Sequence, residues 1–488
     1  MLNSSRVFLK NLRKPVRIAL LLLLVAQLVV YGCYITIIPF HYDEWYSWRY
    51  FANTGFWNIF TSYPAPNNHV LYNMAARVFV IAGIKPELAM RLPSLLASLI
   101  ASYYFFKLCR ELFGSVISVF LLAILISLYN YIFYAVEARG YAFIYLFCVL
   151  LMYASLKLSH DYSGRYRLML VLSQFFGLLT VPTFLYPMLP VGIVLFGYVA
   201  IQGVKQVYRL LLDYFAAFLL VVLGYSGILF IGDPQNFLHP QAWTEKFSFS
   251  NPVWFADVIH YLDTRFFELF GIYRLKTSVL LVLATLFYYF FNRSKYSLFM
   301  PVICALMFFS PFFIVLIQKV YPFGRSLYYL VIPSLLLLGF MMLPAARALK
   351  ANFYGTFVFV KWVVILGAML WLGFSLFTYP GKHREHARWD YEIKWIREHY
   401  PGLFHGHIHE IARTGQDSEF YPAEVFSHIC FLNGNPDVTI SRLDSVRTQD
   451  VLVIDGSERE KFRSQMKEYT FIYMYEDVWI YCRNVSGK

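Results

Sequence analysis

Two neighbouring carboxylates, Asp43 and Glu44, stand in a part of the chain where acidic residues are scarce. Residues 1–380 contain 12 Asp and Glu against 28 Lys and Arg. The pair follows a long apolar run, is flanked by aromatic residues and precedes Arg49. A carboxylate in such a partly dry setting is suited to be a general base, and the solvated start of a loop is the structural alternative.

Groups that bind phosphate or sugar hydroxyls recur in three later segments. A guanidinium fork fits a phosphate, and amide or imidazole groups hydrogen-bond hydroxyls. Helix capping by the Asn pair, an ion pair within the second segment and snorkelling cations in the third are the structural alternatives. The candidate binding residues are Asn67, Asn68, His69 and Tyr72; then Glu137, Arg139 and Tyr141; and finally Lys319 and Arg325.

The elements that must position these residues are membrane helices. Hydrophobic residues make up 59% of the 488, charged residues 15%, and the mean hydropathy is +0.53. A soluble protein carries roughly 25% charged residues, and a spanning helix needs about 20 apolar residues. We therefore predict an all-α polytopic membrane domain over residues 1–380 with eleven spans, at 17–38, 91–108, 114–134, 141–158, 168–183, 187–204, 210–231, 276–292, 298–317, 327–345 and 357–378.

The charges of the short linkers predict the orientation. The linkers at 109–113, 159–167, 205–209, 293–297 and 346–356 all fall on the side of the N-terminus and carry Lys and Arg. The positive-inside rule then places the N-terminus in the cytoplasm. The outer face receives a first loop at 39–90, with an interfacial helix over 69–83, a second at 232–275, a short one at 318–326 and the tail. All candidate site residues fall on this face.

The tail, residues 381–488, has a different composition, with 14 Lys and Arg against 17 Asp and Glu. We predict a small soluble extracytoplasmic α/β domain, with helices near 390–399 and 458–468 and strands near 450–455, 470–476 and 478–482. Cys430 and Cys482 either pair in an oxidising compartment or stay free. His405, His407 and His409 fit a solvated strand edge, or alternatively a zinc site.

Five motifs follow one another along residues 15–160. They are Asp43-Glu44, Asn67-Asn68-His69 before Leu71-Tyr72, Arg91-Leu92-Pro93-Ser94, Arg110-Glu111-Leu112-Phe113-Gly114 and Glu137-Ala138-Arg139-Gly140-Tyr141. In this order they resemble the motifs of one family, the protein O-mannosyltransferase superfamily, which includes the aminoarabinose transferases of lipid A. Two family features are missing, since the Lys-Pro that often precedes Leu-Tyr is absent before Leu71-Tyr72 and the Trp-Trp-Asp of oligosaccharyltransferases is absent from the chain.

The resemblance implies a GT-C fold and an inverting transfer of a monosaccharide from a polyprenyl phosphate to a glycan, lipid or protein hydroxyl. It makes Asp43 the base with support from Glu44. Arg139 and Arg325 would hold the donor phosphate, and Asn68 and His69 would line the sugar pocket. We expect no cofactor, no metal and no nucleic acid, and a location in a bacterial inner membrane.

Two other functions use similar features. An O-antigen ligase or polymerase also acts on lipid carriers and places cations in a late outer loop, which here is 232–275 with His239, Arg265 and Arg274. A transporter would need charged residues facing each other at the membrane midplane. The apolar runs contain few such residues, and the second half of the chain shows no clear repeat of the first.

Overall fold

A computed structural model describes residues 12–63, 68–232, 234, 237, 249–250, 252–270, 275–292, 298–386, 408–411, 441–442, 451–455, 469–475 and 478–483. The chain divides into two compact units. The first comprises Met1–Ile37 and Tyr50–Tyr379, and the second comprises Ile38–Arg49 and Pro380–Lys488. The two units are described separately.

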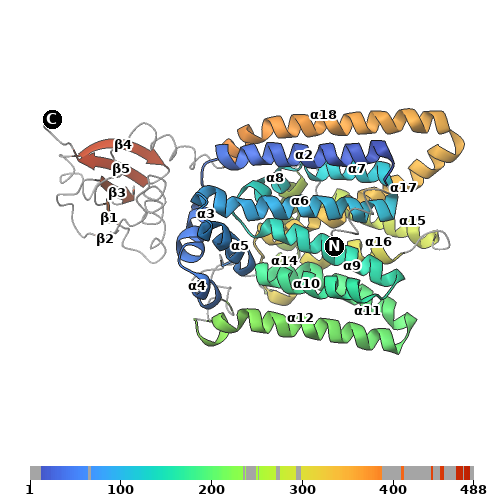
Figure 1. Ribbon diagram of the computed structural model, residues 1–488, viewed down its shortest axis with the longest axis horizontal. Coiled ribbons are helices and arrows are strands. Elements are labelled where there is room, and N and C mark those ends of the chain that lie inside the picture. The colour runs from blue at the N-terminus through green and yellow to red at the C-terminus, as the bar shows by residue number, and fades with distance from the viewer. Residues whose placement is uncertain are drawn as a thin grey trace. The chain divides into compact units, whose positions relative to one another are not determined.

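The first unit is a bundle of long helices that run side by side (Figure 1). Short helices α4 (Phe56–Thr61) and α5 (Val70–Ile81) lie at one end of it (Figure 1). Further short elements are η2 (Pro182–Phe184), α14 (Trp254–Phe270) and η4 (Gly324–Leu330). The long bundle helices, with the segments α7 and α8, are α2 (Lys14–Ile37), α6 (Pro86–Phe113), α7 (Ser115–Leu125), α8 (Tyr129–Val136), α9 (Tyr141–His160), α10 (Gly164–Thr180), α11 (Leu185–Gln202), α12 (Val204–Phe230), α15 (Leu275–Phe291), α16 (Phe299–Gln318), α17 (Val331–Asn352) and α18 (Tyr354–His386).

The chain is an integral membrane protein, since seven of the described helical segments are long and apolar enough to cross a membrane. An eighth span arises if α7 and α8, which meet at a 66° bend, are one broken span. Ten of the eleven predicted spans coincide with one helix each, and the span predicted at 114–134 coincides with the bent pair α7 and α8. However, α10 and α15 have 17 residues each, at the lower limit for crossing, and part of α18 lies outside the described side chains. The number of spans beyond eight therefore stays a prediction.

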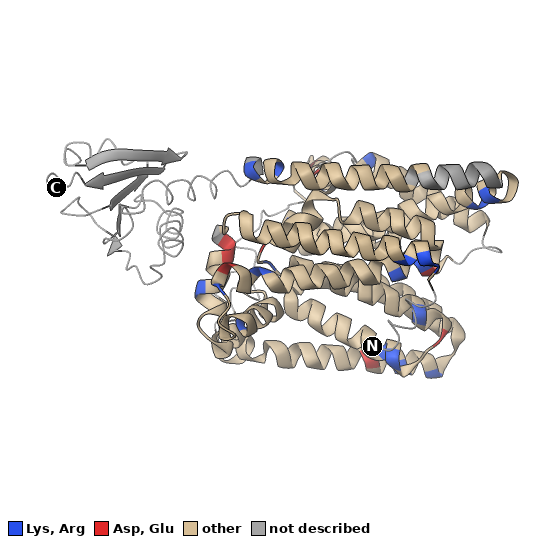
Figure 2. Cartoon of the chain, turned by 45° about the horizontal axis from the view of Figure 1, so that its top comes forward, with Lys and Arg blue, Asp and Glu red and all other residues tan. Residues whose placement is uncertain are grey.

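The two ends of the bundle differ in charge. We call the end that carries α4, α5, the turn 137–140 and η4 the site end. The opposite end, with the tight connections at Gly114, 161–163, Gly203 and Phe353, is the linker end. Lys and Arg gather mainly at the linker end (Figure 2). The predicted cytoplasmic orientation of the linker end depends on this excess of Lys and Arg.

Hydrogen bonds satisfy the backbone where the α7–α8 span breaks. Tyr31 on α2 donates its hydroxyl to the carbonyl of Ile126 at 2.7 Å, directly at the break. Tyr131 on α8 donates to the carbonyl of Ser98 on α6 at 2.7 Å, and Gln27 on α2 donates to the Ser98 hydroxyl at 3.3 Å. An unpaired polar group is costly in an apolar setting, so these bonds fix α2, α6 and the bent span relative to one another.

The second predicted outer loop, residues 232–275, contains a helix, α14, that was not predicted from the sequence. α14 has buried apolar residues at positions 258, 262, 266 and 269, which is the spacing of one helical face. Val258 and Leu262 pack against Val315 of α16. A helix, α5, is present where the interfacial helix is expected, over 69–83. Its N-cap is His69, without a side-chain hydrogen bond, so the structural alternative in which Asn68 caps the helix is not found.

In the second unit, the described strands form one mixed sheet in the order β2-β1-β3-β5-β4. β1 (Ile408–Ile411) pairs in parallel with β2 (Ser441–Arg442) and β3 (Val451–Asp455). β5 (Val478–Arg483) pairs antiparallel with β3 and with β4 (Tyr469–Tyr475). The expected helices at 390–399 and 458–468, and Cys430, His405 and His407, lie outside the described residues. Within the described ranges, no group of three metal-binding side chains occurs.

A glycine sets the contact between α12 and α4. A Cβ atom at Gly227 would lie 2.3 Å from the carbonyl oxygen of Phe60, which belongs to the backbone and cannot rotate away. We expect Gly227→Ala to destabilise the protein by about 1–3 kcal/mol because the two helices must separate. Thermal unfolding of the purified protein in detergent measures this loss.

The control is Gly197→Ala on α11, where an added Cβ meets nothing within 4 Å. That variant should match the wild type or be slightly more stable, because alanine favours helix. Equal unfolding temperatures for the two variants would contradict the close α12–α4 contact.

Candidate active site

Three segments that are far apart in the sequence meet at the site end of the first unit. They are His69 before α5, the turn 137–140 between α8 and α9, and η4 with Arg325. The positive charge of Arg325 acts on both His69 and Arg139, which places the three side chains in one region. His69 and Arg139 are buried and Arg325 is half-buried. The structure therefore brings together three of the residues predicted from sequence.

The turn 137–140 is held by its backbone. The Arg139 amide donates to the carbonyl of Glu137 at 2.9 Å, and the hydroxyl of Ser94 on α6 donates to the Arg139 carbonyl at 2.9 Å. Gly140 has no side chain at the point of closest packing. A Cβ there would lie 2.9 Å from Cγ2 of Thr180 and 3.0 Å from Cβ of His69. The glycine thus lets the turn reach the His69 ring.

His69 is a neutral imidazole with a vacant acceptor. Its Nδ1 lies 3.3 Å from the carbonyl oxygen of Thr180, and since a carbonyl only accepts, Nδ1 is assigned the hydrogen. Burial, with a smaller effect of the Arg325 charge, lowers the pKa of His69 to about 4. Nε2 is then a buried lone pair, and it has no hydrogen-bond partner in the structure. A hydroxyl group of a bound sugar is a suitable donor.

Arg139 sits where a positive charge is unfavourable. Burial, and next the charge of Arg325, lower the pKa of Arg139 to about 9, so it remains charged at neutral pH. Its guanidinium group also hydrogen-bonds the hydroxyl of Tyr141. The buried guanidinium group of Arg139 and the half-buried one of Arg325 repel each other. An anion bound between them would relieve that repulsion, and a phosphate fits both forks.

Aromatic rings form one wall of this region. Tyr141 packs edge-on against His69, with ring centroids 5.2 Å apart, and contacts Tyr134 at 4.7 Å. Tyr134 in turn contacts Tyr328 of η4 at 4.8 Å, and their hydroxyls are hydrogen-bonded. Tyr141 is among the residues predicted from the sequence, whereas Tyr134 and Tyr328 are not. Nothing in the local pattern separates them from the many core tyrosines.

A charged pair on α14 supports η4. Arg265 makes hydrogen bonds to both carboxylate oxygens of Glu268, at 2.8 and 2.7 Å. Its side chain lies against Gly324, where an added Cβ would be 3.0 Å from Cδ of Arg265. The pair therefore packs at the start of the 3-10 helix that carries Arg325. In the sequence, the spacing of Arg265 and Glu268 at i and i+3 could have indicated this pair on a helix.

The remaining predicted binding residues have other contacts. Asn68 donates to the carbonyls of Ile59 and Ser62, both at 2.8 Å, and so fixes its own loop. Tyr72 donates to the carbonyl of Met90 at 2.7 Å. Lys319 is exposed, with its ammonium group 5.9 Å from the ring centroid of Phe249. Asn67 lies outside the described residues, and Glu137 is buried at the end of α8.

The two predicted catalytic carboxylates lie in the second unit, on the short helix α3 (Tyr42–Ser47). Glu44 is fully buried and accepts a hydrogen bond from the backbone amide of His41 at 2.7 Å. His41 in return accepts from the Asp43 amide at 3.2 Å through Nδ1, which completes a capping box. That bond requires an unprotonated Nδ1, so the 3.9 Å approach of Asp43 to the same atom is not an ion pair. The Asp43 side chain is 19% exposed.

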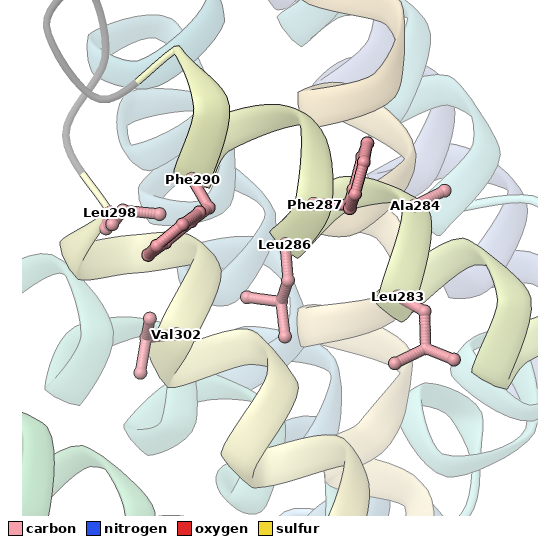
Figure 3. A pocket seen from close by; sticks show the side chains of 7 residues that line it. All are labelled: Leu283, Ala284, Leu286, Phe287, Phe290, Leu298 and Val302. Carbon is pink, nitrogen blue, oxygen red and sulfur yellow. The ribbon is translucent and has the colours of Figure 1, made fainter.

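One hollow of the first unit is lined by none of the predicted site residues. It has a volume of about 660 Å³ and lies between α15 and α16 (Figure 3). All seven lining side chains are apolar, among them Phe287, Phe290 and Val302. Such a surface provides no group for phosphate or sugar, and it is suited to contact lipid chains.

Comparisons with known proteins agree with the helical architecture. Residues 61–245 match the Alg9-like mannosyltransferase family, and no curated protein matches the chain by sequence. The chain has the fold of the GT-C glycosyltransferases, and the resemblance that its motifs indicate is confirmed.

Among solved structures, the chain is similar to ArnT from Cupriavidus metallidurans. The apo structure gives a TM-score of 0.59 at 11% identity, covering 94% of this chain and 97% of that one. The structure bound to undecaprenyl phosphate gives 0.58 at 11% identity, covering 96% and 98%. The Archaeoglobus fulgidus oligosaccharyltransferase with zinc and sulfate gives 0.43 at 12% identity, covering 94% and 73%, which is too low to carry an argument.

The protonation of His69 predicts how stability depends on pH. The folded protein keeps His69 neutral down to about pH 4, whereas the unfolded chain binds a proton below about pH 6.5. Unfolding therefore takes up a proton in this window, and stability falls as the pH drops from 6.5 towards 4. We expect His69 to contribute at most about 1.4 kcal/mol per pH unit.

Thermal unfolding at pH 7 and pH 5 tests this in the wild type, His69→Gln and His260→Gln. His69→Gln should reduce the pH dependence, and the variant of the exposed His260 should keep it. A His69→Gln protein with the same pH dependence as the wild type would show that the buried imidazole is not the group responsible.

Proposed function

We propose that the protein is an inverting glycosyltransferase that moves a monosaccharide from a polyprenyl phosphate to a hydroxyl acceptor at the outer face of the membrane. The observation that carries this proposal is the meeting of Arg139, Arg325 and His69 at the site end. Two cations and one neutral acceptor are the groups needed to bind a phosphate and the sugar attached to it. The donor class draws further support from the ArnT structure, which binds undecaprenyl phosphate.

The two arginines would act on the leaving group. As the bond between the sugar and the phosphate breaks, negative charge develops on the phosphate oxygens. Arg139 and Arg325 are fixed by the turn 137–140 and by η4, so they can stabilise that charge without rearranging. The negative charge that develops on the phosphate would offset the repulsion between the two arginines most fully in the transition state. Interactions that are stronger in the transition state than in the bound substrate accelerate the reaction. We propose that no metal is required.

Asp43 would be the general base that takes the proton of the acceptor hydroxyl. Glu44 is committed to the cap of α3, so its role is to orient the helix rather than to contact substrate. The Asp43 carboxylate is partly exposed and belongs to the segment that directly follows α2. Attack from the face opposite the phosphate inverts the anomeric carbon, and a positioned base contributes about 10²–10⁴-fold to the rate.

His69 would contribute to recognition of the sugar. Its Nε2 accepts one hydrogen bond, and the Tyr141 ring beside it offers an apolar face. A donor hydroxyl on the sugar would satisfy a buried acceptor that otherwise costs free energy. We place the site on the extracytoplasmic side of a bacterial inner membrane, with the linker end in the cytoplasm.

Replacing the base tests the mechanism. We expect Asp43→Asn to reduce transfer from the correct polyprenyl-phosphate sugar by at least about a hundredfold. The measurement is transfer from a panel of radiolabelled donors into membrane acceptors. Glu87→Gln, which removes a carboxylate from the first turn of α6, serves as the matched control and should retain activity. Full activity of a folded Asp43→Asn protein would exclude Asp43 as the base.

Replacing an arginine tests the phosphate site independently of turnover. We expect Arg325→Gln to weaken the binding of polyprenyl phosphate by about tenfold to a hundredfold, because a charge-assisted hydrogen bond is lost. Arg325→Lys should recover part of the affinity through its charge. Lys85→Gln, an exposed cation at the start of α6, is the control. If Arg325→Gln bound polyprenyl phosphate as tightly as the control, η4 would not be part of the donor site.

A further inference from the structure

A second hollow, part polar and part apolar, lies at the linker end of the bundle, opposite the site end. We call it the linker-end cavity. It has a volume of about 240 Å³, and its polar lining residues are Glu111, Lys157, His160 and Arg347. They come from the ends of α6, α9 and α17, next to the tight connections of that end. None of the predicted site residues lines it.

The charge around the linker-end cavity is predominantly positive. Lys157 forms an ion pair with Glu111 at 2.8 Å, and Glu111 is the one carboxylate among the described lining residues. Lys107 lies behind this pair, buried over the rings of Tyr104 and Tyr153, each 5.1 Å from its ammonium group. Lys107 is within electrostatic range of Lys157 and also of Arg165. Among the described residues, the lining itself therefore holds two cations, Lys157 and Arg347, against one carboxylate, and Lys107 adds positive charge from outside the lining.

The rest of the lining is apolar. Met300 and Phe340 contribute to the wall, and Tyr289 packs edge-on against Phe340 with centroids 5.2 Å apart. The cavity is thus cationic on one side and apolar on the other. A small inorganic ion would use only the cationic side, whereas a lipid headgroup with its glycerol and first methylenes would contact both.

The apolar hollow of Figure 3 lies along the same helix segments. Phe290 of that hollow follows Tyr289 of the linker-end cavity, and Leu298 and Val302 flank Met300. The two hollows therefore occupy neighbouring faces of the α15 and α16 ends. A lipid with its headgroup in the linker-end cavity and an acyl chain along the apolar hollow would use both surfaces.

We propose that the linker-end cavity binds the phosphate headgroup of an anionic membrane phospholipid. Basic pockets between membrane helices are suited to this role, and each Lys or Arg near an anionic headgroup strengthens binding by about fivefold. The proposal does not depend on the glycosyltransferase function. It rests on the two lining cations, Lys157 and Arg347, and on the apolar residues beside them.

The test uses the full-length protein in detergent, titrated with phosphatidylglycerol or phosphatidylcholine, with bound lipid counted by native mass spectrometry. We expect tighter binding of phosphatidylglycerol, and a loss of at least about tenfold in the double variant Lys157→Gln/Arg347→Gln. The matched control is Lys205→Gln/Lys350→Gln, two exposed cations of the same end that do not line the cavity.

Arg347→Gln alone covers the case in which loss of the Lys157–Glu111 contact prevents folding. Arg347 is exposed, so its variant should fold and bind phosphatidylglycerol about fivefold more weakly. Equal affinities for the cavity and control variants would overturn the proposal. Displacement of phosphatidylglycerol by an equal concentration of inorganic phosphate would also overturn it, because the site would then be one for a free anion.

Discussion

The contact of the turn 137–140 with His69 is the constraint on which the candidate site depends. Gly140 lies so close to His69 and Thr180 that a methyl group does not fit between them. Because Ser94 holds the Arg139 carbonyl from α6, the turn cannot shift away from this contact. The Arg139 side chain is therefore directed into the region that Arg325 also reaches. The position of both cations follows from backbone packing rather than from their own charges.

The same principle gives a structural role to other residues of the family-like motifs. Arg91 donates to the carbonyl of Ile35 near the end of α2, at 3.0 Å. Ser94, one turn later, holds the turn that carries Arg139. Gly114 has a φ of 80°, which permits α6 to pass directly into α7. These residues fix the geometry of the helix ends, and the chemistry depends on that geometry.

Cations serve different purposes at the two ends of the bundle. At the site end, Arg139 is buried and Arg325 is half-buried, so the positive potential is concentrated where an anion would bind. At the linker end, most cations are exposed and Lys157 is already paired with Glu111. Exposed charges are screened and are worth little individually, whereas buried ones act strongly on their neighbours. The scarcity of acids in residues 1–380 increases the contrast.

The sequence by itself determined the helical membrane architecture. Bilayer thickness sets the length of the apolar runs, and loop charge sets their predicted orientation, and both are local properties of the sequence. It also identified His69, Arg139 and Arg325 as candidates by residue type. Only the tertiary structure decided that they meet, since 256 positions separate His69 from Arg325 and no local pattern encodes that contact. It likewise decided that Glu44 caps a helix, that Asn68 binds its own loop, and that α14 brings Arg265 to η4, because each depends on which atoms packing leaves within hydrogen-bond distance.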